Sequence, residues 1–137
     1  MTPNKVIEMV DKLRPNPYDE ETKLSWINDL DGNVRRLVFQ WDEKYIETIK
    51  TQYEEGKITE EEYKAIIDKT KPYVYPNDMD KELLITDPFE SVYALYLETM
   101  IDYHNREYGN YNNSASMFET RFADYKKAYI REHQARG

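Results

Sequence analysis

The chain has 137 residues, of which 39% are hydrophobic and 34% charged, which suits one domain with a thin core. It has no cysteine, which excludes disulfides and thiolate metal sites. The formal net charge is −8, and the segment 42–90, with 14 acidic and 7 basic residues, carries −7 of it. This distribution argues against DNA wrapping around the whole molecule, because nucleic-acid-binding proteins present a basic surface. No segment resembles a signal peptide or a membrane span, so we expect a soluble, intracellular protein.

The first predicted element is a short helix at the start of the chain. Only 4 glycines are present, and helix-forming residues are common, so the composition favours an all-α fold. Thr2 is placed to cap the helix and Pro3 to occupy its first position, where proline is tolerated. Pro15 and Pro17 then end the helix.

A second helix is predicted to begin after Asp19, which is a favourable capping residue. Its apolar residues recur every three or four positions and define one buried face; they are Leu24, Ile27, Leu30, Val34, Leu37, Val38 and Trp41. Gly32 interrupts the pattern without changing its phase. We therefore expect the helix to continue through Gly32, at a cost of about 1 kcal/mol.

Residues 42–54 and 59–71 are predicted to form a heavily acidic helical hairpin that projects from the core. Thr59 and Glu62 have the spacing of a capping box at the start of its second helix. Residues 72–87 follow as an irregular loop, because Pro72 and Pro76 interrupt any helix there. The loop contains an apolar patch at residues 83–85, and we favour an anchoring role for it over a functional one.

The remainder of the chain predicts a long antiparallel helix pair. The first helix should start at Asp87-Pro88, with Glu90 completing a capping pattern. A break is expected at Gly109-Asn110, and the last helix should then start between Asn112 and Ser114. Together these elements predict one domain, residues 1–137: a small all-α bundle with a projecting hairpin.

The sequence contains no recognisable catalytic motif. Its glycines are isolated, so no glycine-rich phosphate-binding loop can form, and the histidines are limited to His104 and His133. Glu107 lies three residues after His104, but one such pair does not make a metal site. We therefore expect no catalytic residue, no cofactor and no metal, and hence a protein that is not an enzyme.

Aromatic and basic residues near the C-terminus are the best candidates for a functional surface. Tyrosine is enriched in protein interfaces, although a tyrosine-rich core would explain the same pattern equally well. The basic segment 126–136 could be a solvated helix end or a tail that docks on an acidic partner. The candidate interface residues are Tyr93, Tyr96, Tyr103, Tyr108, Tyr111, Lys126, Lys127 and Arg131.

The C-terminal part of the chain contains a series of distinctive motifs: Leu83-Leu84, Asp87-Pro88-Phe89, Tyr93-x-x-Tyr96-Leu97, Ile101-Asp102-Tyr103, Glu107-Tyr108 and Tyr111-Asn112-Asn113-Ser114-Ala115 followed by Phe118. With these motifs, residues 83–132 resemble the head–tail connector (adaptor) proteins of tailed phages and prophages of Gram-positive bacteria. Residues 23–32 are similar to the N-terminal helix of that family, whereas the acidic hairpin at 42–71 departs from its shorter pattern.

The resemblance implies a non-catalytic helical protein that forms a ring beneath the portal of the capsid and extends the DNA channel. Its partners would be the portal protein, the next tail-completion protein and further copies of itself, with DNA only as passing cargo and no membrane. The protein would reside in the virion and could be monomeric in isolation. The alternative is an acidic helical module that binds and regulates another protein of the phage or its host.

Overall fold

The computed structural model describes residues 1–136, and the side chains of residues 1–133. The described chain is all-α, with six α-helices, one π-helical turn and no strand. The elements are α1 (Pro3–Leu13), α2 (Glu20–Asn33), η1 (Val34–Val38), α3 (Glu43–Glu54), α4 (Glu60–Lys69), α5 (Ser91–His104) and α6 (Tyr108–Arg136).

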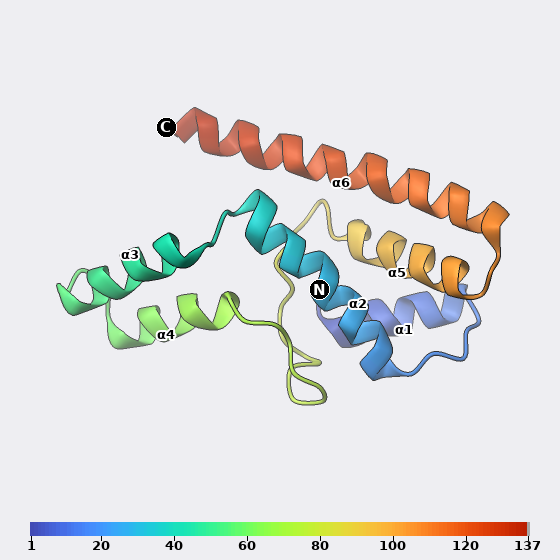
Figure 1. Cartoon of the computed structure of the whole chain (residues 1–137), viewed down its shortest axis with the longest axis horizontal. Helices are drawn as coiled ribbons and strands as arrows, with labels where there is room; N and C mark the ends of the chain where they lie inside the picture. Colours follow the sequence, from blue (N-terminus) through green and yellow to red (C-terminus); the bar gives the residue numbers. More distant parts are fainter. Residues whose placement is uncertain (137) are drawn as a thin grey trace.

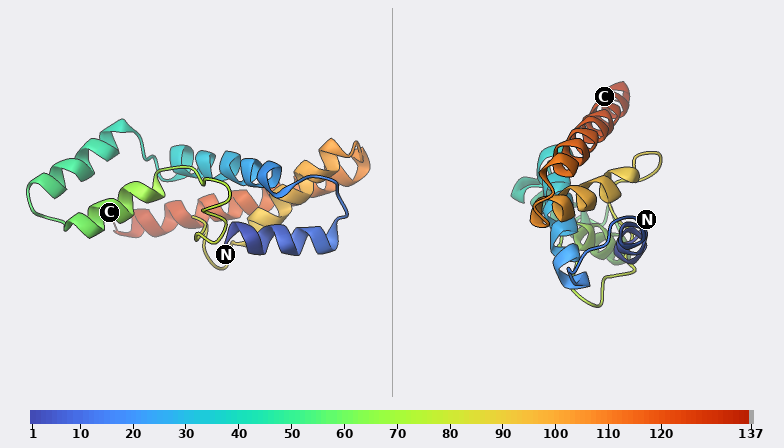
Figure 2. Two further views of the ribbon diagram at one scale, coloured as in Figure 1. Left: turned by 90° about the horizontal axis from the view of Figure 1, so that it is seen from below. Right: turned by 90° about the vertical axis from the view of Figure 1, so that its right-hand side faces the viewer.

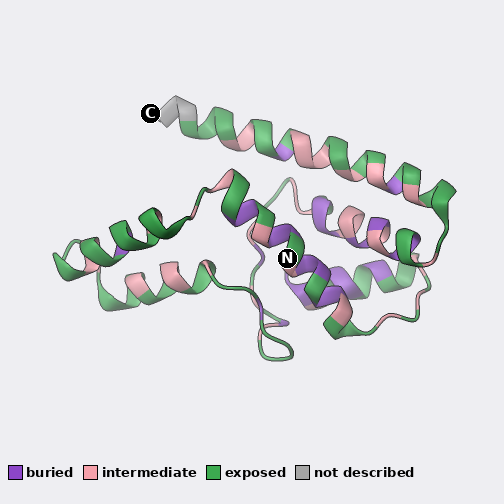
Figure 3. Ribbon diagram, viewed as in Figure 1, coloured by how far each residue is buried: buried purple, intermediate pink, exposed green. Residues whose placement is uncertain are grey.

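The helices form an elongated molecule with two distinct regions (Figures 1 and 2). We call α1, α2, α5 and the segment 72–90, which contains the loop 72–87, the body. α6 packs on the body and runs antiparallel to α5. The hairpin of α3 and α4 projects from one end. Buried residues concentrate in the body, whereas the hairpin is almost entirely exposed or half-buried (Figure 3).

Several helix starts agree with the sequence predictions. The Thr2 and Asp19 side chains accept hydrogen bonds from the backbone N–H groups of Lys5 and Thr22, so both cap their helices. Thr59 and Glu62 form the predicted capping box of α4. These side chains satisfy backbone donors that a helix leaves unpaired in its first turn.

The end of α2 is only partly as expected. The helix continues through Gly32, as predicted, but after Asn33 it widens into the π-helical turn η1 and ends at Val38. Gln40 then adopts a positive φ of 57°, so Trp41 lies outside the helix that was expected to include it. This bend directs the chain into the hairpin.

The loop 72–87 is fastened to the body by apolar side chains. Tyr73, Met79, Leu83 and Ile85 are all buried in the same core cluster as the apolar faces of α1, α2 and α5. The backbone N–H of Leu83 also donates to the carbonyl of Met1, at 2.9 Å. The loop is therefore part of the core, which agrees with the anchoring role.

Two predicted boundaries in the C-terminal helix pair are wrong. α5 begins at Ser91, because residues 86–90 form turns and Glu90 makes no side-chain capping bond. α6 begins at Tyr108, so Gly109 and residues 112–114 lie inside the helix. The chain reverses at residues 105–107 instead of at Gly109-Asn110, and Arg106 there adopts a left-handed φ of 61°, a conformation that glycine adopts more readily.

Candidate interaction surfaces

The body is organised around a buried carboxylate, that of Asp31 on α2, which is fully shielded from solvent. It accepts hydrogen bonds from the Tyr73 hydroxyl at 2.5 Å and the Tyr93 hydroxyl at 2.7 Å. Burial raises the pKa of Asp31 above its ordinary value, while the two tyrosine hydrogen bonds act in the opposite direction. One carboxylate therefore joins α2, the loop and α5.

This network removes Tyr93 from the candidate interface. The Tyr93 side chain is 0% exposed, and its hydroxyl also accepts a hydrogen bond from the backbone N–H of Ile85, at 2.8 Å. Burial raises the pKa of Tyr93 well above its ordinary value. The prediction was wrong for Tyr93, because a residue enclosed by its own chain cannot contact a second protein.

A second buried carboxylate, that of Asp102, ties the ends of three helices together. The Ser114 hydroxyl on α6 donates to Asp102 Oδ2 at 2.5 Å, and Arg14, just after α1, approaches the same oxygen at 3.6 Å. Asp102 Oδ1 is buried without a hydrogen-bond partner. Ser114 therefore connects α5 to α6 from inside α6, and it does not lie at the start of the last helix as expected.

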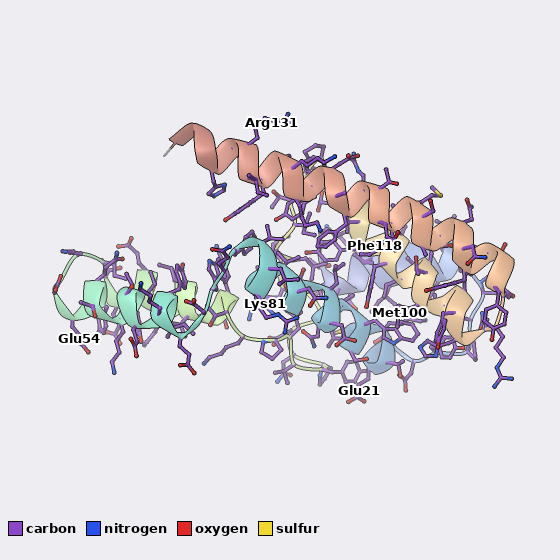
Figure 4. The ribbon with its side chains drawn as sticks, turned by 45° about the horizontal axis from the view of Figure 1, so that its top comes forward. Glu21, Glu54, Lys81, Met100, Phe118 and Arg131 are labelled. Atoms are coloured by element: carbon purple, nitrogen blue, oxygen red, sulfur yellow. The ribbon has the colours of Figure 1, made fainter. Side chains whose placement is uncertain are left out.

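Stacked aromatic rings fill the seam between α5 and α6. Tyr96 of α5 lies against Phe118 of α6, with ring centroids 5.1 Å apart, and Phe118 faces α5 (Figure 4). Phe122 and Tyr125 continue the row along α6. Tyr96 is half-buried, and its burial raises its pKa. Most of the Tyr96 surface therefore belongs to the intramolecular seam.

Three of the predicted tyrosines gather around the turn between α5 and α6. Tyr103 and Tyr108 are 51% and 58% exposed, and Tyr111, which is half-buried, lies 5.5 Å from Tyr103 between ring centroids. We call Tyr103, Tyr108 and Tyr111 the tyrosine end. Exposed aromatic groups of this size favour contact with another protein, because the ring is apolar while the hydroxyl remains compatible with water.

The predicted basic residues share the exposed side of the C-terminal half of α6. Lys126, Lys127 and Arg131 are exposed, and Ile130 between them is 53% exposed. Lys126 lies over the ring of Phe122, at 5.0 Å, while Lys127 and Arg131 make no ion pair within the described part of the chain. Arg131 projects away from the body (Figure 4). Residues 134–136 of the predicted tail lie outside the described side chains.

The hairpin presents a mainly acidic surface and an aromatic root. Within its two helices Ile49, 7% exposed, is the one buried residue, and Tyr53 stacks on Tyr63 with ring centroids 4.7 Å apart. At the root, a hollow of about 490 Å³ lined by Phe39 and Trp41 lies between the hairpin and the loop. An adjoining hollow of about 270 Å³, also lined by Phe39, lies between the loop and α6. Their walls are largely aromatic and aliphatic, and they also contain ionisable side chains: Tyr45, Lys69 and Glu82 in the first hollow, and Asp87, Glu132 and His133 in the second.

No metal site is found among the described residues, in which no three His, Cys, Asp or Glu side chains converge. His104 stacks on Trp26, with centroids 5.2 Å apart and planes 6° apart, so its ring is engaged in packing. A larger hollow of about 830 Å³ lies along α1, lined by charged side chains such as Glu8, Lys12 and Asp80.

The sequence did not predict that Asp31, Asp102 and Ser114 form buried hydrogen bonds that connect the helices. A weak signal existed for Asp31, because it lies four residues after Ile27 on the apolar face of α2. Asp102 follows the buried Ile101 and is itself fully buried. A charged residue on a buried helical face predicts a hydrogen-bonded partner, but the sequence does not name that partner.

Within the residues that the structure describes, no helix is both long and apolar enough to cross a lipid bilayer. Comparisons of the chain with protein-family models, with curated proteins and with solved structures give no match.

Proposed function

We propose that this chain is a structural subunit of a phage head–tail connector, without enzymatic activity, that resides in the virion. The observation that carries the proposal is the tyrosine end, where large aromatic side chains stay exposed although the other Phe, Tyr and Trp side chains of the body, apart from Tyr75, are buried or half-buried. The motif resemblance of residues 83–132 supplies the identity of the assembly. In it the subunits form a ring under the portal and extend the DNA channel.

The shape and charge of the chain are compatible with this role. A ring needs two different surfaces on each subunit, because head-to-tail contacts close only when one patch meets another patch on the next copy. The tyrosine end lies at the opposite end of the elongated molecule from the hairpin (Figure 1), so a portal contact through the tyrosines leaves the hairpin end open to the next copy. The net charge of −8 would let DNA pass without being retained, because like charges repel.

The test is binding to the portal protein encoded in the same genome, measured by sedimentation velocity. We expect a complex that contains many copies of this chain for each portal ring. The variant Tyr103→Ser/Tyr108→Ser should weaken that complex by about tenfold or more, as expected for aromatic interface anchors. Met117→Ser on α6, where Met117 is 52% exposed, is the control and should bind normally.

A failure to form any complex with the portal would contradict the proposal. Binding of one copy to a different phage or host protein, with no larger assembly, would instead favour the acidic helical regulatory module. Normal portal binding by the double tyrosine variant would exclude the tyrosine end from the contact.

A further inference from the structure

The helices α3 and α6 carry matching surface patterns of opposite charge. On α6, Ile130 is accompanied by Lys126 at i−4, Lys127 at i−3 and Arg131 at i+1. On α3, Ile46 is accompanied by acids at the same three positions, and these are Asp42, Glu43 and Glu47. We call these sets the basic face and the acidic face.

Each face is a contiguous surface that remains mostly open within the chain. The exceptions are Asp42, which caps α3 by accepting the Tyr45 backbone N–H, and Lys126, which lies over the Phe122 ring. Residues three and four apart are neighbours on a helix, which places the charges of each set around its isoleucine. Ile130 is 53% exposed and Ile46 is 37% exposed, and all six charged residues are exposed. Lys50 lies one turn beyond Ile46, so the acidic face ends there.

The two faces do not pair within one molecule. α6 touches the root of the hairpin through Tyr129, whose ring lies 5.1 Å from Phe39. Lys127 and Arg131 belong to the opposite side of α6 from Tyr129, and the described residues contain no ion pair between α6 and α3. Two complementary faces on one chain that do not meet each other can meet on two copies.

We propose that the basic face of one copy docks on the acidic face of the next copy, with Ile130 against Ile46. This rests on the proposed ring and names the surfaces that join its subunits. In the proposed ring the contact is head-to-tail: each copy uses its basic face on one neighbour and its acidic face on the other, and the contact repeats from copy to copy. A contact of two helical turns is small, so it is weak in solution, sensitive to salt, and strengthened when the portal gathers the copies.

The absence of cysteine in the chain permits a direct cross-linking test. Ile46→Cys and Ile130→Cys variants are purified separately, mixed at low ionic strength with and without the portal, and oxidised. We expect a disulfide-linked heterodimer from the mixture, and little product from either variant alone. Mixing Ile46→Cys with Met117→Cys, which places the thiol elsewhere on α6, is the control and should give little product.

Charge reversal provides the second arm. Glu43→Lys/Glu47→Lys and Lys126→Glu/Lys127→Glu/Arg131→Glu, each placed in the corresponding cysteine variant, should lower the cross-linking rate by about tenfold when only one is reversed. Combining both reversed partners should restore the rate, because opposite charges again face each other. Glu54→Lys/Glu61→Lys changes the hairpin charge equally outside the acidic face and should leave the rate unchanged.

The possible outcomes distinguish a failure of the inferred subunit contact from a failure of the connector proposal. If the portal complex forms but positions 46 and 130 never link within it, the inferred contact is wrong and the connector proposal stands. If no portal complex forms yet the two positions link and respond to charge reversal, the contact is correct and the connector proposal is wrong. Linking that ignores both charge reversals would also overturn the inferred contact.

Discussion

The helix α5 and the hairpin of α3 and α4 are equally regular, yet they are held in place by very different amounts of packing. Six residues of α5 are buried, whereas α3 buries only Ile49 and α4 buries none. Apolar burial supplies most of the free energy that offsets the loss of chain entropy. We therefore infer that the body carries the stability of the fold, while the hairpin contributes surface.

The strongest perturbation of the body should be Asp31→Ala. This change leaves the buried hydroxyls of Tyr73 and Tyr93 without their acceptor, so we expect the free energy of unfolding to fall by about 3–5 kcal/mol. Chemical denaturation measures the loss. Asp29→Ala, on the exposed side of the same helix, is the control and should change stability little. Equal effects of the two changes would contradict the central role of Asp31.

The same substitution in both regions sharpens the difference between them. Ile101→Ala in α5 should lower the free energy of unfolding by about 2–5 kcal/mol, because Ile101 is fully buried in the core. Ile49→Ala in α3 should lower it by about 1 kcal/mol or less, because the hairpin can open without the body. A comparable loss at both positions would show that hairpin and body unfold as one unit.

The raised pKa of Asp31 predicts a pH dependence that belongs to the body. An acid with a higher pKa in the folded state binds more protons folded than unfolded, so stability falls as the pH rises from about 4 through the raised pKa. The fall is about 1.4 kcal/mol for each unit of elevation. Denaturation across this pH range should show the slope, and Asp31→Asn should remove it, while Asp29→Asn keeps it.

The most local expected effect concerns the stack of Tyr53 on Tyr63 within the hairpin. Tyr53→Ala should cost the hairpin about 0.5–1.5 kcal/mol beyond the lost burial, since stacked aromatic pairs contribute in this range. Amide hydrogen exchange should become faster in α3 and α4 but not in α5. Faster exchange in α5 as well would mean that the hairpin supports the body.

The helices could be predicted from the sequence because capping residues and apolar spacing act over only a few neighbouring positions. Thr2, Asp19 and Thr59 cap the helices they were predicted to cap, and the apolar spacing of α2 survives Gly32. A capping residue acts on backbone groups only two or three positions away, so its effect does not depend on the rest of the fold.

The turn between α5 and α6 was predicted at the wrong residues, because tertiary contacts decide its position more strongly than the preference of glycine for turns does. Arg106 accepts a left-handed backbone while Gly109 lies in the first turn of α6. Asp102 and Ser114, buried against each other, fix where the two helices meet. The same limit explains Tyr93: it was predicted as an interface residue, but its hydroxyl donates to Asp31, which lies 62 positions earlier in the sequence.

The guanidinium of Arg35 connects the two ends of the hairpin where they join the body. Arg35 Nε on η1 donates to the backbone carbonyl of Lys69 at the end of α4, at 2.8 Å, and the same side chain lies over the ring of Tyr73. The chain therefore leaves the body and returns to it at nearly one spot. A segment with adjoining ends behaves as a module: it can be shortened, lengthened or exchanged for a brief linker while the rest of the fold keeps its geometry.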